Sequence, residues 1–191
     1  MIYFLKRGDS YMFDINIIFN ILLSDNILAH ESELFELIPE LKNEKGFEQR
    51  NEWHCFDVWE HTLATINACD MNPEDRLVML LHDIGKPILY QDDGNIRHFK
   101  GHAKKSAEIA KIVLDRFNIN DDLKNMILKL IELHSTKIEV DSVNLNNIDF
   151  YKRLLKIQMC DAKGYEAEHS NLALQRINSI NYKLMLKETR L

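Results

Sequence analysis

Apolar residues recur every three or four positions along most of the chain, the spacing that buries one face of a helix. This periodicity predicts helices over residues 13–28, 32–41, 103–117, 121–134, 148–163 and 166–187. Between residues 87 and 99 the period changes, and the run Asp92-Asp93-Gly94 predicts a tight turn. We therefore expect an all-α helical bundle of about seven or eight helices with a small β-hairpin insertion.

A helix is also indicated by the pattern of a capping box. Asp57 can accept from the free backbone amides of a first turn, while Glu60, three positions later, can reach back to the backbone of Asp57. This pattern places His61 near the start of the helix.

The next helix is marked at both ends. Asn72 is a favourable N-cap and Pro73 suits the first helical position, whereas Gly85 is typical of a residue just past a helix end. His82 and Asp83 are therefore expected side by side in the last turn of this helix.

The composition fits one domain with a substantial core. The chain has 191 residues, of which 46% are apolar, and we expect N-terminal helices over 1–45, a core over 54–165 and a C-terminal helix over 166–191. Its longest apolar runs are far below the roughly 18 residues that span a bilayer. We expect a cytoplasmic protein with no membrane partner; its oligomeric state stays open.

Charge and cysteine content narrow the classes of function. A net charge of −6 provides no general attraction to nucleic acid, unless Lys104, Lys105, Lys111 and the basic residues of 152–156 form a local face. The three cysteines form no CxxC pair, so we expect three reduced thiols. Trp53 and Trp59 are expected to be packing residues.

Two ionisable residues continue apolar helical stripes. His134 follows Leu130 and Ile127 on one face of its predicted helix, and Asp161 follows Ile157 on another. Burying such groups is costly unless a partner satisfies them. A divalent metal shared with the adjacent pair His82-Asp83 would do so, but separately satisfied core polar groups fit the spacing equally well.

The order of these residues resembles a known superfamily. Glu60-His61-Thr62-Leu63, His82-Asp83-Ile84-Gly85-Lys86-Pro87 and Asp161 are similar to the H…HD…D signature of HD-domain metal-dependent phosphohydrolases. Residues 35–165 further resemble the HD region of bacterial CCA-adding tRNA nucleotidyltransferases and poly(A)-polymerase-like proteins. The chain lacks the Gly-Ser motif of their nucleotidyltransferase head, so the resemblance implies a free-standing HD domain.

The resemblance implies a set of metal ligands. His61, His82, Asp83 and Asp161 would hold one divalent ion, and His102 and His134 a second, with Asp83 bridging. Such a ligand set suits Mn, Fe, Co, Ni, Zn or Mg, and we expect one or two ions per chain.

The resemblance also implies residues for substrate. Lys86 would meet the substrate phosphate and act in catalysis together with Asp83, although a solvated lysine at a helix end is the alternative. His54 and Arg97 are further candidates for substrate binding, with surface roles as the alternative.

The expected function is hydrolysis of a nucleotide or related phosphate ester, as a phosphomonoesterase or 2′,3′-cyclic phosphodiesterase, through a metal-activated water. The stretch after His82-Asp83 lacks the motifs of alarmone hydrolases and cyclic-di-GMP phosphodiesterases. The alternatives are a non-catalytic HD module that binds a nucleotide or RNA, an HD-fold di-iron oxygenase, and a helical scaffold with polar core residues.

Overall fold

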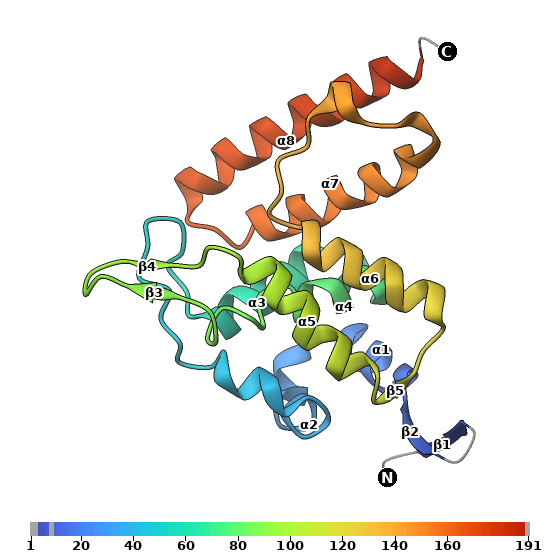
Figure 1. Cartoon of the computed structure of the whole chain (residues 1–191). Coiled ribbons are helices and arrows are strands. Elements are labelled where there is room, and N and C mark those ends of the chain that lie inside the picture. Colours follow the sequence, from blue (N-terminus) through green and yellow to red (C-terminus); the bar gives the residue numbers. More distant parts are fainter. Residues whose placement is uncertain (1–3, 8–9, 190–191) are drawn as a thin grey trace.

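Eight α-helices form the described part of the chain, which comprises residues 4–7 and 10–189 of a computed structural model (Figure 1). They are α1 (Ile15–Leu22), α2 (Glu31–Leu37), α3 (Val58–Ala68), α4 (Pro73–Leu81), α5 (His102–Leu114), α6 (Asp121–Leu133), α7 (Ile148–Ala162) and α8 (Ala167–Glu188). Short 3-10 turns lie at Ile27–His30, Pro39–Asn43, Val140–Ser142 and Leu145–Asn147. The all-α bundle that the sequence predicts is confirmed.

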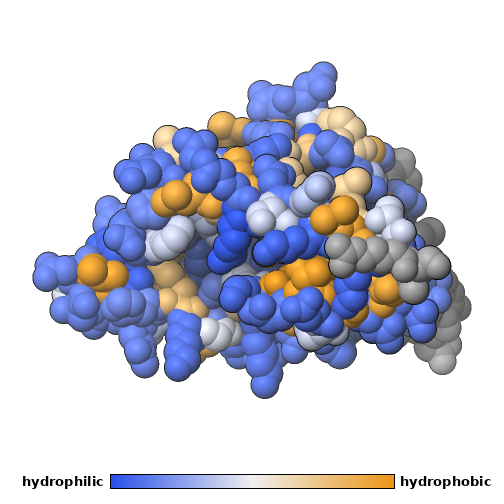
Figure 2. Space-filling model, turned by 90° about the horizontal axis from the view of Figure 1, so that it is seen from above, coloured by the Kyte–Doolittle hydropathy of each residue, from blue (hydrophilic) through white to orange (hydrophobic). Residues whose placement is uncertain are grey.

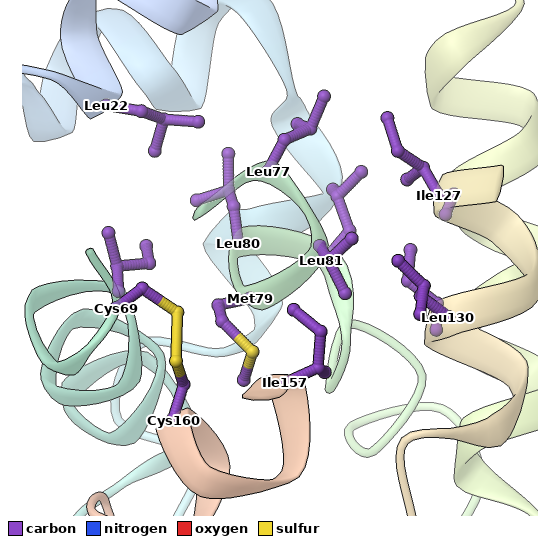
Figure 3. Packing of buried hydrophobic residues seen from close by; sticks show 14 of the residues in the cluster. Leu22, Cys69, Leu77, Met79, Leu80, Leu81, Ile127, Leu130, Ile157 and Cys160 are labelled. Atoms are coloured by element: carbon purple, nitrogen blue, oxygen red, sulfur yellow. A yellow bond between two sulfur atoms is a disulfide. The ribbon is translucent and has the colours of Figure 1, made fainter. Parts of the chain in front are cut away.

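Helix α4 lies at the centre of the core. It packs against α1, α3, α5, α6 and α7, and the consecutive residues 77–81 are all fully buried. Figure 3 shows Leu77, Leu80 and Leu81 of α4 facing Leu22 of α1 and Ile127 of α6. The second half of α4 is apolar on every side and needs neighbours on every side, which places this helix in the middle of the molecule.

The predicted caps around α3 and α4 are present. Asp57 accepts from the backbone of Glu60 at 2.7 Å, Glu60 accepts from the backbone of Asp57 at 3.2 Å, and Asn72 caps α4. Helix α4 ends earlier than predicted, at Leu81, and Gly85 does not adopt a left-handed conformation. Gly85 instead permits close packing, because a Cβ there would lie 2.7 Å from the backbone nitrogen of Ser106.

A small sheet occupies the predicted start of the 13–28 helix and the predicted end of the 103–117 helix. Strand β1 (Phe4–Arg7) is antiparallel to β2 (Ser10–Asp14), which pairs in parallel with β5 (Phe117–Asn118). Phe13 and Phe117, both predicted to be helical, are register partners with ring centroids 5.6 Å apart. Local periodicity could not reveal this pairing, because it joins segments about a hundred positions apart.

The predicted hairpin is present. Strand β3 (Gln91–Asp92) is antiparallel to β4 (Arg97–His98), and Gly94 has a φ of 96° in the turn. It is attached to the 46–57 connection through an ion pair of Arg50 with Asp92 and through Arg97, whose guanidinium lies 4.4 Å from the Phe47 ring centroid. The hairpin extends from one side of the bundle (Figure 1).

One buried hydrophobic cluster runs from Ile15 to Leu184, which supports our proposal of a single domain. Among the described helices, none combines the length and hydrophobicity required to cross a membrane. Figure 2 shows mostly hydrophilic residues on one face, with separate hydrophobic patches between them.

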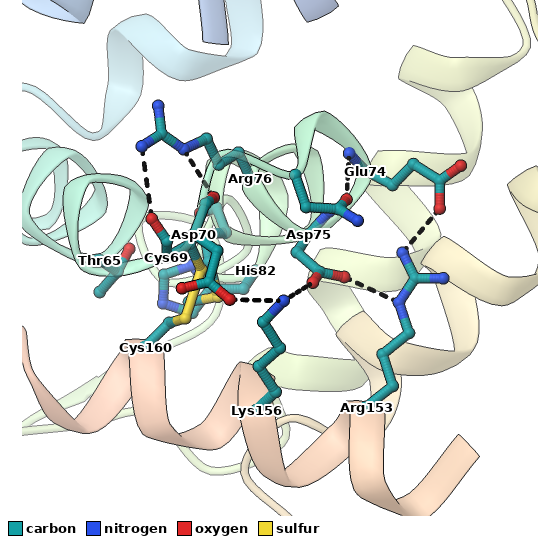
Figure 4. The surroundings of a disulfide bond; sticks show 12 residues. Thr65, Cys69, Asp70, Glu74, Asp75, Arg76, His82, Arg153, Lys156 and Cys160 are labelled. Carbon is teal, nitrogen blue, oxygen red and sulfur yellow. Dashed lines mark hydrogen bonds and ion pairs between the residues drawn. A yellow bond between two sulfur atoms is a disulfide. The ribbon is translucent and has the colours of Figure 1, made fainter. Parts of the chain in front are cut away.

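The cysteine prediction is wrong for two of the three thiols. Cys69, at the end of α3, forms a disulfide with Cys160 of α7, with Cα atoms 5.4 Å apart, whereas Cys55 is free and exposed (Figure 4). The two partners are separated by 91 positions, so their spacing in sequence carries no signal of the pairing. The bond ties α3 to the residue that precedes Asp161.

We expect Cys160→Ala to lower the free energy of unfolding by about 2–4 kcal/mol, because the disulfide closes a long loop and restricts the unfolded chain. Urea unfolding under non-reducing conditions measures the difference. The matched variant Cys55→Ala removes an exposed free thiol and should change this free energy by less than about 0.5 kcal/mol. Equal urea midpoints for wild type and Cys160→Ala would contradict a stabilising disulfide.

Candidate metal centre

The six predicted ligands meet where five helices approach one another. Each lies at or near a helix end: His61 in the first turns of α3, His82 and Asp83 directly after α4, His102 at the start of α5, His134 as the C-cap of α6 and Asp161 near the end of α7. All are buried except His102, which is half-buried. The structure therefore brings together every residue of the predicted ligand set.

The four histidines share one hydrogen-bonding arrangement. Each can donate from Nδ1 to a backbone carbonyl: His61 to Gly164 at 3.0 Å, His82 to Met79 at 2.6 Å, His102 to Phe99 at 2.7 Å and His134 to Ile131 at 2.7 Å. A neutral imidazole that donates from Nδ1 keeps a lone pair on Nε2. All four rings are thus oriented with Nε2 toward the carboxylates.

The first group of donor atoms surrounds one side of Asp83. The Nε2 atoms of His61 and His82 lie 3.4 Å apart, and Asp161 Oδ1 is 3.1 Å from the former. Asp83 Oδ2 lies 3.2 Å from His82 Nε2. Lone pairs and carboxylate oxygens at these distances repel one another unless a proton or a metal cation lies between them.

The second group surrounds the other oxygen of the same carboxylate. His102 Nε2 and His134 Nε2 are 3.2 Å apart, at 3.4 and 3.8 Å from Asp83 Oδ1. Neither oxygen of Asp83 accepts a hydrogen bond, although the side chain is buried. Asp83 therefore has the position of a bridge between two groups of nitrogen ligands.

These atoms fit a divalent cation by their chemistry. Two buried sets, His61 with His82 and Asp161, and His82 with Asp83 and His134, place their donor atoms within 4.8 Å of one another. Imidazole nitrogen and carboxylate oxygen are ligands of first-row transition metals and, for the carboxylates, of Mg²⁺. A cation at this point would complete the coordination of the Asp83 carboxylate, whose Oδ2 otherwise pairs with the Lys86 ammonium group.

Burial and neighbouring charges determine which side chains of the cluster are charged and which are neutral. Burial by itself raises the pKa of Asp83, but the charges of His82 and Lys86 outweigh it and hold this pKa well below its usual range. Burial lowers the pKa of His82, yet Asp83 and Asp161 together raise it to about 10. Burial lowers the pKa of His134 to about 4, so this ring is neutral near pH 7, as a metal ligand must be.

Lys86 lies beside the Asp83 carboxylate, as the sequence predicts for a residue of the site. Its Nζ is 2.7 Å from Asp83 Oδ2 and donates to Gln49 Oε1 at 2.7 Å. The side chain is buried, which excludes the alternative of a solvated lysine. Its role toward a substrate stays a prediction.

The two further candidates for substrate binding, His54 and Arg97, line a pocket that Asp83 and Lys86 also line. The His54 ring packs on His61 with centroids 4.8 Å apart, and burial lowers its pKa to about 2. Arg97 donates to the Glu48 carbonyl at 2.5 Å and pairs with Asp92 at 3.3 Å, so its guanidinium holds the hairpin. Substrate binding by either residue stays a prediction.

A pocket of about 550 Å³ opens above the cluster. The predicted ligands Asp83, His102, His134 and Asp161 form part of its lining, and Lys86, Arg97, His98 and Lys100 add basic side chains. A negatively charged small molecule can thus reach the cluster past positive groups.

Sequence reasoning missed Tyr165 and Gly164. The Tyr165 hydroxyl donates to Asp161 Oδ2 at 2.9 Å, and its ring lies parallel to that of His61 within 14°. A Cβ on Gly164 would lie 2.7 Å from His61 Nδ1. The signal available was the glycine three positions after Asp161, where α7 ends and the chain turns past His61.

We expect Gly164→Ala to destabilise the protein by about 1–3 kcal/mol through overpacking and to weaken Mn²⁺ binding at least about tenfold, because the added methyl displaces His61. Thermal unfolding and calorimetric Mn²⁺ titration measure the two effects. Gly94→Ala strains the hairpin turn but meets no atom within 4 Å, so its Mn²⁺ affinity should match wild type. Unchanged Mn²⁺ affinity in Gly164→Ala would show that His61 is not held this way.

Metal affinity should rise with pH. Because the pKa of His82 is raised to about 10 in the metal-free cluster, this ring carries a proton at neutral pH that an incoming cation must displace. We expect the Mn²⁺ affinity to increase roughly tenfold per unit between pH 6.5 and 8.5, with about one proton released per ion. Calorimetry in buffers of different ionisation enthalpy counts the proton, and an affinity independent of pH would contradict the expectation.

Comparison with known proteins agrees with this geometry. The chain is 24% identical over 160 residues to the A-adding tRNA nucleotidyltransferase of Deinococcus radiodurans, covering 73% of this chain and 37% of the relative. It is 30% identical over 108 residues to the CC-adding tRNA nucleotidyltransferase of Thermus thermophilus, covering 53% and 25%. The chain thus spans well under half the length of either relative. A model of the HD domain matches residues 54–175, so the chain belongs to the HD domain family.

Proposed function

We propose that this protein hydrolyses a phosphate ester, either a phosphomonoester or a 2′,3′-cyclic phosphodiester, in a nucleotide or related compound. The observation that carries the proposal is the buried Asp83 carboxylate, which pairs with Lys86 and lies between two pairs of facing imidazole nitrogens. Membership of a family of metal-dependent hydrolases supports it.

Six side chains would hold one or two divalent ions. His61, His82, Asp83 and Asp161 form one group, and His102 and His134 form the other with Asp83 between them. Bound there, a divalent ion supplies an acidified water and neutralises charge on phosphoryl oxygens. The carbonyl partners of the four Nδ1 atoms keep the rings in the tautomer and orientation that this role requires.

Lys86 supplies a fixed positive charge at the floor of the pocket. Its contact with Gln49 Oε1 positions the ammonium group, and its distance of 2.7 Å to Asp83 places it next to the ligand cluster. A phosphoryl group held at the cluster would gain a charged hydrogen-bond donor whose position is set before substrate arrives. Tyr165 orients the Asp161 carboxylate from the opposite side.

A nucleotide is favoured over RNA as the substrate. The named relatives act in tRNA nucleotide addition, which suits a ligand of nucleotide chemistry. Four of the basic residues that were candidates for an RNA-binding face lie beside acidic ones: Lys105 with Glu108, Lys111 with Asp115, Lys152 with Glu188 and Lys156 with Asp75. Such pairing leaves little net positive potential for a phosphate backbone.

We expect purified wild-type protein to hold one or two metal ions per chain and to hydrolyse 2′,3′-cyclic AMP or p-nitrophenyl phosphate with added Mn²⁺. Asp83→Asn keeps the shape of the side chain but removes its charge, so metal content should fall below about 0.2 per chain and kcat/KM at least about 100-fold. Elemental analysis and steady-state kinetics measure the two quantities.

The matched control is Asp149→Asn, an exposed carboxylate at the opposite end of α7 from Asp161, which should behave as wild type. Metal binding without hydrolysis under any divalent ion would overturn the proposed activity and favour a nucleotide-binding module or an oxygenase. Full metal content in Asp83→Asn would overturn the proposed ligand set.

A further inference from the structure

A second cavity, of about 420 Å³, adjoins the pocket above the predicted ligand cluster. Trp53, His134, Ser135, Asp161 and Tyr165 line both spaces, so the two cavities border one another. Beyond this shared border the second cavity lies between α7 and α8, and we call it the side lobe. Its remaining lining is Gln158, Ala162, Leu172, Ala173, Arg176 and Ile177.

Large apolar side chains face this space without cover. Leu172 of α8 is 56% exposed and Trp53 is 41% exposed. Of the two tryptophans expected to pack, only Trp59 is buried. Ala173 and Ile177 extend the same apolar wall along α8. Apolar groups gathered in a concave site beside charged residues are typical of the organic part of a ligand.

Polar groups also line the lobe. Gln158 is buried and donates its side-chain amide to the Thr136 carbonyl at 2.8 Å, which leaves its Oε1 as an acceptor. Arg176 adds a cationic donor from α8 and Ser135 a hydroxyl. A flat ring with hydrogen-bonding atoms on its edge can use both kinds of wall, whereas a hydrocarbon chain would gain nothing from the polar groups.

Trp53 is held in place before any ligand arrives. Its carbonyl accepts from the backbone of Glu166 at 2.9 Å, and its ring contacts His169 at 4.4 Å and Tyr165 at 6.0 Å between centroids. A fixed aromatic face offers stacking with little loss of side-chain entropy on binding. Trp53 stands where the two spaces join, at the border between the phosphate end and the lobe.

We propose that the side lobe binds the heteroaromatic base of a nucleotide whose phosphate lies at Asp83 and Lys86. The inference rests on the proposed function, which assigns the phosphate end, and adds the residues that select the organic group. Leu172 and Ala173 supply the apolar wall, Trp53 the aromatic face, and Gln158 with Arg176 the polar edge. The protein is then selective for nucleoside phosphates over simple phosphate esters.

The test compares ligands that differ only in the organic group. Calorimetry in the presence of Mn²⁺ gives the Kd values of inorganic phosphate, AMP and CMP for wild type, for Ala173→Phe, which fills the lobe, and for Leu172→Ala, which trims an exposed wall without risk to folding. Gln175→Phe places the same ring on an exposed position of α8 outside the lobe and is the matched control.

For wild type we expect at least one of the two nucleotides to bind at least about fivefold more tightly than phosphate, as base stacking provides. Ala173→Phe should abolish that preference, Leu172→Ala should reduce it about threefold, and neither should change the Kd of phosphate or the hydrolysis of methyl phosphate. Gln175→Phe should match wild type.

Equal affinities of wild type for phosphate and both nucleotides, or an unchanged preference in Ala173→Phe and Leu172→Ala, would overturn the lobe assignment while leaving the proposed hydrolase intact. Failure of wild type to bind phosphate and to hydrolyse any ester would overturn the proposed function, and the lobe assignment with it.

Discussion

The structure depends on how the buried charge of Asp83 is compensated. A carboxylate that is removed from water and accepts no hydrogen bond is too costly to keep unless cationic groups surround it. Here His82 and Lys86, from the same turn after α4, supply that environment, while His61, His102, His134 and Asp161 come from other helices. Core packing delivers these segments to one point, because the central position of α4 sets Asp83, directly after its last residue, among the ends of its neighbours.

Helix ends also explain why the imidazoles face inward. Three of the four bonds from Nδ1 go to the carbonyl three positions earlier, as from His82 to Met79 and from His134 to Ile131. Carbonyls in the last turn of a helix lack an intrahelical partner, so His82 and His134, the C-caps of α4 and α6, each satisfy one. His102, the first residue of α5, instead takes the Phe99 carbonyl from the turn before its helix. His61 is the exception and takes its carbonyl from Gly164, which the close approach of α3 to the end of α7 makes possible.

Local signals in the sequence were sufficient for what helical phase and capping control. The positions of His134 and Asp161 at the ends of apolar stripes, and the capping box before His61, all survive in the structure. Pairings across long separations were not accessible, as the β2–β5 contact and the Cys69–Cys160 bond show. Metal binding by the predicted ligands stays a prediction. Their convergence at one point depends on how the helices pack, which helical phase alone does not specify.

The residues proposed to carry the reaction differ from those that would select its substrate. Donor atoms around Asp83 are set by helix ends and, in the proposed reaction, would treat any phosphate ester alike, since they would contact only the phosphoryl group. Selectivity must come from the walls, which are built by the hairpin, the segment around Trp53 and the first turns of α8. None of these walls carries a motif, because an apolar surface with one polar edge can be made from many residue combinations. The substrate of such a protein is therefore encoded in shape rather than in the residues that mark its chemistry.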